Sequence, residues 1–195
     1  MRKDILDGVQ LILYKTKQMK EIDINRIQTG DILLYKNKGF LPRAIRWFTR
    51  TDVNHVSIAI EMWGEMFVFE SIGKGFVPQR IEDSIRGADI TVMKPNYRID
   101  KRQISLLTAS MSGHHRYDFF ALLVHQPIYT ITKRLFGKGK WIGRRDEKAI
   151  KRLYCSEAIA YIYNYFTPSI MKQWWKYYPG MFLKEEEFTF FKLEQ

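Results

Sequence analysis

The sequence is poor in the residues that staple small folds or bind metals. It has 195 residues, and one of them is cysteine, four are histidine and six are proline. A single cysteine cannot form an internal disulfide, so no disulfide cross-links the fold. No CxxC or HExxH spacing occurs, and His114, His115 and His125 lack the paired spacing of a zinc site. We therefore expect neither a metal nor a nucleotide cofactor, since Walker A, GxGxxG and GxSxG patterns are also missing.

Long apolar runs and export signals are likewise missing. The apolar stretch near the N-terminus covers only residues 9–14, Asp4 and Asp7 interrupt its basic start, and no small-residue cleavage site follows. No segment reaches the roughly 18 apolar residues that a membrane-spanning helix needs. We therefore expect a cytoplasmic protein, with release by lysis or delivery in a phage particle as a route to the outside.

The composition nevertheless supports a folded and strongly basic protein. Hydrophobic residues make up 46% of the chain and aromatic residues 15%, with no low-complexity run, so a single domain over residues 1–195 is expected. The formal net charge of +11 attracts polyanions such as nucleic acid, anionic lipid or acidic cell-wall polymer. Residues 1–24 have the apolar spacing of an amphipathic helix, and residues 132–153 are expected to form a basic, exposed loop insertion.

Residues 54–71 give the clearest strand signal. Apolar and small residues alternate over 55–60, a turn follows near Gly64, and alternation resumes over 66–70, which predicts a hairpin. An even number of loop residues would place His55, Ser57 and Glu70 on one face, with Ser57 or Ala59 opposite Glu70. Further strands are expected at residues 32–35 and before Pro95, and helices over 101–112 and over 117–125, the latter ending before Pro127.

The lone cysteine lies where an aromatic-rich helix is expected to begin. Apolar residues follow Cys155 at helical spacing, which places its sulfur on the buried stripe at the first turn. There the backbone N–H groups and the helix dipole favour a thiolate and can hold an oxyanion. A free cysteine on an apolar stripe is also a common inert core residue. His55 and Glu70 favour the catalytic alternative, because a cysteine nucleophile needs an imidazole partner that a third polar group orients.

These segments resemble a known family. "GDILLYK", the histidine of "NHVSIAI", the acidic residue of "FVFES" and "LYCSEAIAYIY" look like the circularly permuted, papain-like branch of NlpC-type cysteine hydrolases, the YiiX-like group. "RYDFFALL" and "YYPGMF" resemble helix-packing and turn motifs of that group. The resemblance implies an α+β fold with a small antiparallel sheet or barrel packed against helices.

The same resemblance implies a function and a set of site residues. Cys155 would be the nucleophile, His55 the general base and then acid, and Glu70 the group that orients the imidazole. The expected activity is hydrolysis of an amide or ester bond, with a cell-wall peptide, derived from peptidoglycan, as the first substrate. A lipid acyl hydrolase or transferase of the same fold is the alternative enzymatic function. The alternative to an enzyme is a non-catalytic basic module that binds nucleic acid or an anionic membrane.

Overall fold

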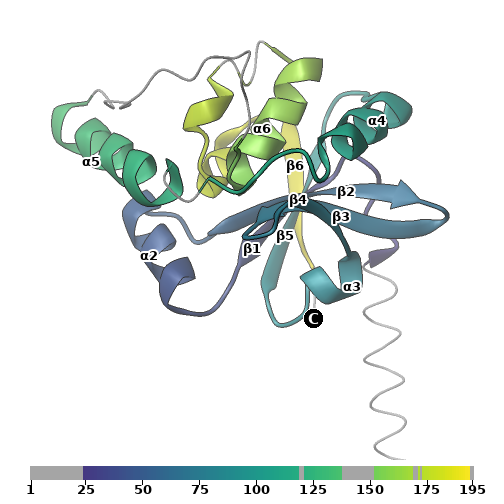
Figure 1. The fold of residues 1–195 in the computed structure, drawn as a ribbon, viewed down its shortest axis with the longest axis horizontal. Helices are drawn as coiled ribbons and strands as arrows, with labels where there is room; N and C mark the ends of the chain where they lie inside the picture. Colours follow the sequence, from purple (N-terminus) through teal and green to yellow (C-terminus); the bar gives the residue numbers. More distant parts are fainter. Residues whose placement is uncertain (1–23, 119–120, 138–151, 169–170, 172, 194–195) are drawn as a thin grey trace, which may run out of the picture.

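The computed structural model describes residues 24–118, 121–137, 152–168, 171 and 173–193 (Figure 1). The helix expected over 1–24 and most of the basic segment expected over 132–153 lie outside these residues.

Six antiparallel strands form one open sheet in the order β4-β3-β2-β1-β5-β6. The strands are β1 (Ile32–Lys36), β2 (His55–Met62), β3 (Glu65–Ile72), β4 (Gly75–Arg80), β5 (Asp89–Pro95) and β6 (Phe188–Leu193). The strands predicted at residues 32–35, 55–60, 66–70 and before Pro95 are confirmed. The α+β class is therefore confirmed, with an open sheet rather than a barrel.

The β2–β3 hairpin has the predicted register. Trp63 and Gly64 form its two-residue turn, and both have a positive φ, 54° and 77°, as this kind of tight hairpin turn requires. Ser57 pairs with Glu70 across the two strands. Because the loop has an even number of residues, His55, Ser57 and Glu70 share one face of the sheet.

The sheet separates two apolar clusters. On one face, α4 (Lys101–Met111) and α6 (Cys155–Phe166) pack on alternate residues of the central strands, such as Ile58 and Phe69. On the other face, the short helix α3 (Ile81–Ser84) packs on Leu33 and Val68. Figure 1 shows α4 and α6 on one side of the sheet and α3 on the other. The central strands are thus covered on both faces, and polar groups between them lie in a dry interior.

Several elements were not predicted. Strand β4 contains Pro78, which a sheet tolerates here because β4 is an edge strand. Helix α2 (Phe40–Thr49) has a proline in its first turn, where the missing N–H has no helical partner to lose. Strand β6 was also missed, and so were the short 3-10 helices η3 (Trp174–Lys176) and η4 (Pro179–Lys184).

The helical region after α4 differs from its prediction. A π-helical turn, η1 (Ala121–His125), runs directly into α5 (Gln126–Phe136), so Pro127 stands at the start of a helix instead of ending one. Residues 132–136, expected to open the basic loop, therefore belong to α5.

Candidate active site

Cys155 is the first residue of α6, as predicted, and its side chain is 2% exposed. The backbone of Tyr154 is extended, and its N–H donates to the carboxylate of Glu157 at 3.3 Å. The hydroxyls of Tyr154 and Ser156 both donate to the carbonyl oxygen of Tyr177, each at 2.8 Å. These bonds hold the two residues that flank Cys155, so the sulfur sits at a well-fixed helix N-terminus. Glu157, three residues after the N-cap, is the capping signal that the sequence analysis missed.

His55 and Glu70 are in direct contact. Nε2 of His55 forms a hydrogen bond and ion pair with Oε2 of Glu70. The His55 side chain is 14% exposed and the Glu70 side chain 6%, so both groups are largely removed from water. Because Nε2 is hydrogen-bonded to Glu70, Nδ1 is the ring nitrogen that can interact with another group.

The charge of Cys155 acts on His55. Burial lowers the pKa of His55, but the negative charge of Cys155, hydrogen bonds with Cys155 and Glu70, and the charge of Glu70 together raise it to about 10. An imidazole with such a pKa is protonated at neutral pH and stabilises an adjacent thiolate. The structure therefore brings together Cys155, His55 and Glu70, the three residues that the sequence analysis selected.

A chain of hydroxyl groups extends from the carboxylate. Ser84 in α3 donates to Oε1 of Glu70 at 3.3 Å, and its oxygen lies 2.8 Å from the hydroxyl of Tyr35. The Tyr35 hydroxyl is also 2.7 Å from Ser57. Because Ser84 gives its proton to Glu70, Tyr35 donates to Ser84 and in turn accepts from Ser57. Burial and then the charge of Glu70 raise the pKa of Tyr35, which keeps its hydroxyl protonated.

Tyr35 also packs on the imidazole. The two residues are paired across β1 and β2, and their ring centroids are 5.2 Å apart. Tyr35 and Ser84 were not selected from the sequence. The alternation of β1 could have placed Tyr35 on the His55 face, whereas no local pattern connects Ser84 with Glu70.

Strand β3 contacts both the imidazole of His55 and the segment that leads to Cys155. Glu70 points to one face of the sheet and binds His55, and the next residue, Ser71, points to the other face. The Ser71 hydroxyl donates to the carbonyl oxygen of Leu153 at 2.5 Å, two residues before Cys155. Successive residues of one strand thus position the imidazole and the segment that carries the sulfur.

Tyr117 is a further residue near the sulfur. Leu153 N–H donates to the carbonyl oxygen of Arg116 at 3.0 Å, which places the chain before Tyr117 against the chain before Cys155. Burial, followed by the charges of Cys155, Glu157 and Asp118, raises the pKa of Tyr117. Part of "RYDFFALL", interpreted in the sequence analysis as a helix-packing motif, therefore lies within electrostatic reach of Cys155.

A small apolar cavity of about 50 Å³ lies beside the site, between α2 and α5. It is lined by Leu41, Ala44, Ile45, Phe48, Thr49, Leu122, Pro127, Thr130, Tyr154, Tyr178 and Pro179. Tyr154, which precedes Cys155, forms part of its wall. This cavity was not predicted, because five of its eleven lining residues belong to α2, a helix that was itself not predicted.

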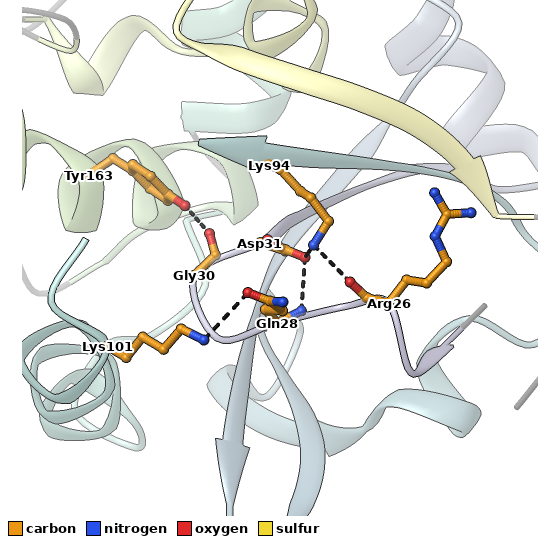
Figure 2. A network of polar contacts seen from close by, with 7 residues as sticks. All are labelled: Arg26, Gln28, Gly30, Asp31, Lys94, Lys101 and Tyr163. Carbon is orange, nitrogen blue, oxygen red and sulfur yellow. Dashed lines mark hydrogen bonds and ion pairs between the residues drawn. The ribbon is translucent and has the colours of Figure 1, made fainter. Parts of the chain in front are cut away.

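Another buried carboxylate, that of Asp31, lies just before β1 and belongs to a network of polar contacts (Figure 2). Oδ2 of Asp31 accepts from Nζ of Lys94 at 2.6 Å and from the N–H of Gln28 at 2.8 Å, and Lys94 also donates to the carbonyl oxygen of Arg26. Tyr163 of α6 donates to the carbonyl oxygen of Gly30. Burial raises the pKa of Asp31, although its bonds with Lys94 and Gln28 oppose that rise. We call this the Asp31 cluster; it ties β1 to β5 and to α6.

Comparison with known proteins identifies the fold. No family model matches the sequence, and no curated protein matches it. Among solved structures, the chain is similar to YiiX from Escherichia coli O157:H7, described as a metalloprotein, with a TM-score of 0.59 and 15% identity. The match covers 86% of this chain and 98% of that one. The chain therefore has a YiiX-like fold, in agreement with that part of the resemblance.

Two further findings concern metals and membranes. Within the described ranges, no group of three or more histidine, cysteine, aspartate or glutamate side chains is arranged as metal ligands. Of the helices that the structure describes, none combines the length and the apolar character needed to cross a bilayer.

Proposed function

We propose that the protein is a thiol hydrolase in which Cys155 is the nucleophile, His55 the general base and acid, and Glu70 the residue that orients the imidazole. The observation that carries this proposal is that the His55 imidazole hydrogen-bonds both with Cys155 and, through Nε2, with Glu70. An isolated core cysteine has no such partner. The observed order of histidine strand, carboxylate strand and cysteine helix supports a permuted papain-like relationship.

The geometry supports acyl transfer through a thioester. The Cys155 thiolate would attack the carbonyl carbon of an amide or ester, and the N–H groups at the start of α6 would stabilise the oxyanion. The His55 imidazolium would then give its proton to the leaving amine or alcohol. A water molecule, losing a proton to the neutral imidazole, would hydrolyse the thioester and release the carboxylic acid. Glu70 would keep Nε2 bonded throughout and so hold Nδ1 toward the sulfur.

The first substrate class is a peptide amide, and cell-wall peptide follows from the family resemblance. A lipid or other long acyl group is the second candidate, and one observation favours it. The cavity between α2 and α5 is walled mainly by apolar side chains and shares Tyr154 with the site. Apolar walls of this kind favour contact with a hydrocarbon group over contact with a polar peptide.

A metal-dependent reaction does not fit the residues at this site. The YiiX structure is described as that of a metalloprotein. Here His55 and Glu70 bind each other, and the part of the chain that the structure describes contains no cluster of metal ligands around them. We therefore propose no step through a metal.

Alkylation of Cys155 by iodoacetamide near pH 6 tests the proposal. We expect fast labelling, because an imidazole hydrogen-bonded to a cysteine sulfur activates that sulfur as a nucleophile. His55→Ala should slow labelling by about tenfold or more, since one pKa unit corresponds to a factor of ten. His114→Ala is the matched control, because His114 is exposed and bonds only to the local backbone carbonyl of Ser112 among the contacts recorded for it.

Labelling as slow as that of an ordinary cysteine, or equal in His55→Ala and the wild type, would contradict the proposal and favour a non-catalytic module. A substrate panel then separates the two substrate classes. Muropeptides and acyl esters of increasing chain length should be compared in the wild type and in Ala44→Trp, which fills the cavity. A loss confined to long acyl esters would identify the acyl class, whereas muropeptide cleavage unaffected by Ala44→Trp would identify the peptide class.

A further inference from the structure

Helices α2 and α5 expose apolar side chains that a protein in water normally buries. On α2, Phe40 is 90% exposed and Trp47 is 72% exposed, and their spacing of seven residues puts them on one face of the helix. On α5, Leu135 is 67% exposed and Phe136 is 75% exposed. The two helices pack against each other and form one end of the molecule (Figure 1). We call this exposed end the α2–α5 surface.

Both helices carry exposed basic residues beside these apolar side chains, and neither helix contains an acidic residue. Arg43 and Arg50 are exposed on α2 and at its C-cap, and Lys133 and Arg134 are exposed on α5. No aspartate or glutamate occurs in either helix, nor anywhere between Ile32 and Thr51. The α2–α5 surface therefore combines exposed aromatic and aliphatic side chains with positively charged ones.

We infer that the α2–α5 surface docks on an anionic lipid bilayer. Aromatic and aliphatic side chains enter the boundary between headgroups and acyl chains, while arginine and lysine remain with the lipid phosphates. A second copy of the chain fits less well, because a symmetric contact would bring two positive surfaces together. The phosphates of a nucleic acid would also attract the basic residues. A nucleic acid has no hydrocarbon layer, however, into which an aliphatic side chain such as Leu135 could insert.

This inference does not depend on the chemistry of Cys155. Cys155→Ala should bind vesicles as the wild type does, so failure of one proposal is distinguishable from failure of the other. The two proposals are nevertheless compatible in space, because the apolar cavity lies between the same two helices.

Sedimentation of the full chain with vesicles tests the inference. We expect binding to vesicles that contain phosphatidylglycerol, little binding to pure phosphatidylcholine, and weaker binding as salt is added. The double variant Phe40→Ser/Trp47→Ser should reduce partitioning by about tenfold or more, since each buried aromatic side chain contributes strongly. Both side chains are largely exposed, so the fold should persist, and a thermal unfolding curve checks this.

Matched variants at the other end of the molecule serve as controls. Trp63→Ser removes a tryptophan that is 90% exposed in the β2–β3 turn, and this turn lies at the opposite end from α2 and α5 (Figure 1). It should leave binding unchanged. Arg43→Glu should weaken binding by at least about fivefold, given the contribution of one basic residue near an anionic surface. Arg86→Glu makes the same change of charge on the exposed loop after α3 and should have a much smaller effect.

Three results would overturn the inference. The first is a wild type that does not sediment with anionic vesicles. The second is equal binding by Phe40→Ser/Trp47→Ser and Trp63→Ser. The third is a dimer in light scattering, or a complex with duplex DNA, that depends on Phe40 and Trp47 while vesicle binding does not.

Discussion

In the part of the chain that the structure describes, Asp31 and Glu70 are each buried beside a basic group, and the two pairs differ in the further contacts of that basic group. In the Asp31 cluster, Lys94 divides its donors between Asp31 and a backbone carbonyl, and Asp31 also accepts a backbone N–H. At the candidate active site, Glu70 binds one of the two ring nitrogens of His55, and the charge of Cys155 acts on the same imidazole. The first arrangement fixes three chain segments, whereas in the second the imidazole links a carboxylate to the sulfur of Cys155.

This difference shows why burial of charge alone does not mark an active site. Asp31 and Glu70 are exposed to a similar extent, 3% and 5%. Lys94 is bonded both to Asp31 and to the carbonyl oxygen of Arg26, so the Asp31 cluster joins a side chain to the backbone of a neighbouring segment. The His55 imidazole has two ring nitrogens, so it can bond to Glu70 through one of them while the other faces a second group, and the proposed mechanism uses this property.

The largest predicted effect breaks the Asp31 cluster. Lys94→Met leaves the buried Asp31 carboxylate without its cation, which should lower the free energy of unfolding by about 2 kcal/mol, a factor of about thirty in the equilibrium constant. Urea unfolding of the two proteins measures this. The rate of Cys155 alkylation in the folded variant should match the wild type. A variant that keeps its stability but loses thiol reactivity would reverse the roles of the two clusters.

A smaller effect is expected at Glu70. Glu70→Gln keeps the shape but removes the charge that raises the pKa of His55, so the thiolate is less well stabilised. Alkylation near pH 6 should slow by about tenfold, the factor that one pKa unit represents. Asp31→Asn is the matched control, and it should change this rate little. Equal slowing in both variants would mean that the effect is a general loss of structure.

The smallest effect concerns the link between β3 and α6. Ser71→Ala removes the hydrogen bond to the Leu153 carbonyl and should lower the free energy of unfolding by about 1 kcal/mol. If this bond also positions the sulfur, alkylation should slow by a few-fold in the folded variant. Ser105→Ala, which removes only a hydroxyl bonded within α4, controls for loss of a serine. An alkylation rate equal in Ser71→Ala and Ser105→Ala would limit Ser71 to a structural role.

Local periodicity was enough to predict the parts of the site that each lie within one element. The alternation around Gly64 gave the hairpin register that puts His55 and Glu70 on one face, and the helical spacing after Cys155 gave the start of α6. The meeting of the sulfur with the imidazole is a contact between residues 100 positions apart, which no periodicity encodes. Here the family resemblance supplied the expectation.

Other features depended on long-range context. Strand β4 was hidden by Pro78, and its edge position became evident only in the sheet. Tyr35, Ser84 and Tyr117 come from three separate elements, and each has an ordinary local sequence. The cavity and the α2–α5 surface require two helices to pack together, and α2 was not predicted at all.

Titration of His55 by NMR tests the central claim most directly. In the wild type, the folded pKa lies above the ordinary value of 6.5, so the proton on His55 stabilises the fold below about pH 6.5, and this contribution is lost as the pH rises through about 10. In Cys155→Ala the largest contribution that raises the pKa disappears while burial still lowers it, so the midpoint should fall by more than one unit. The account predicts an imidazolium at neutral pH in the wild type and a clearly lower midpoint in the variant. An identical midpoint in the two proteins would show that the sulfur and the imidazole do not share a proton.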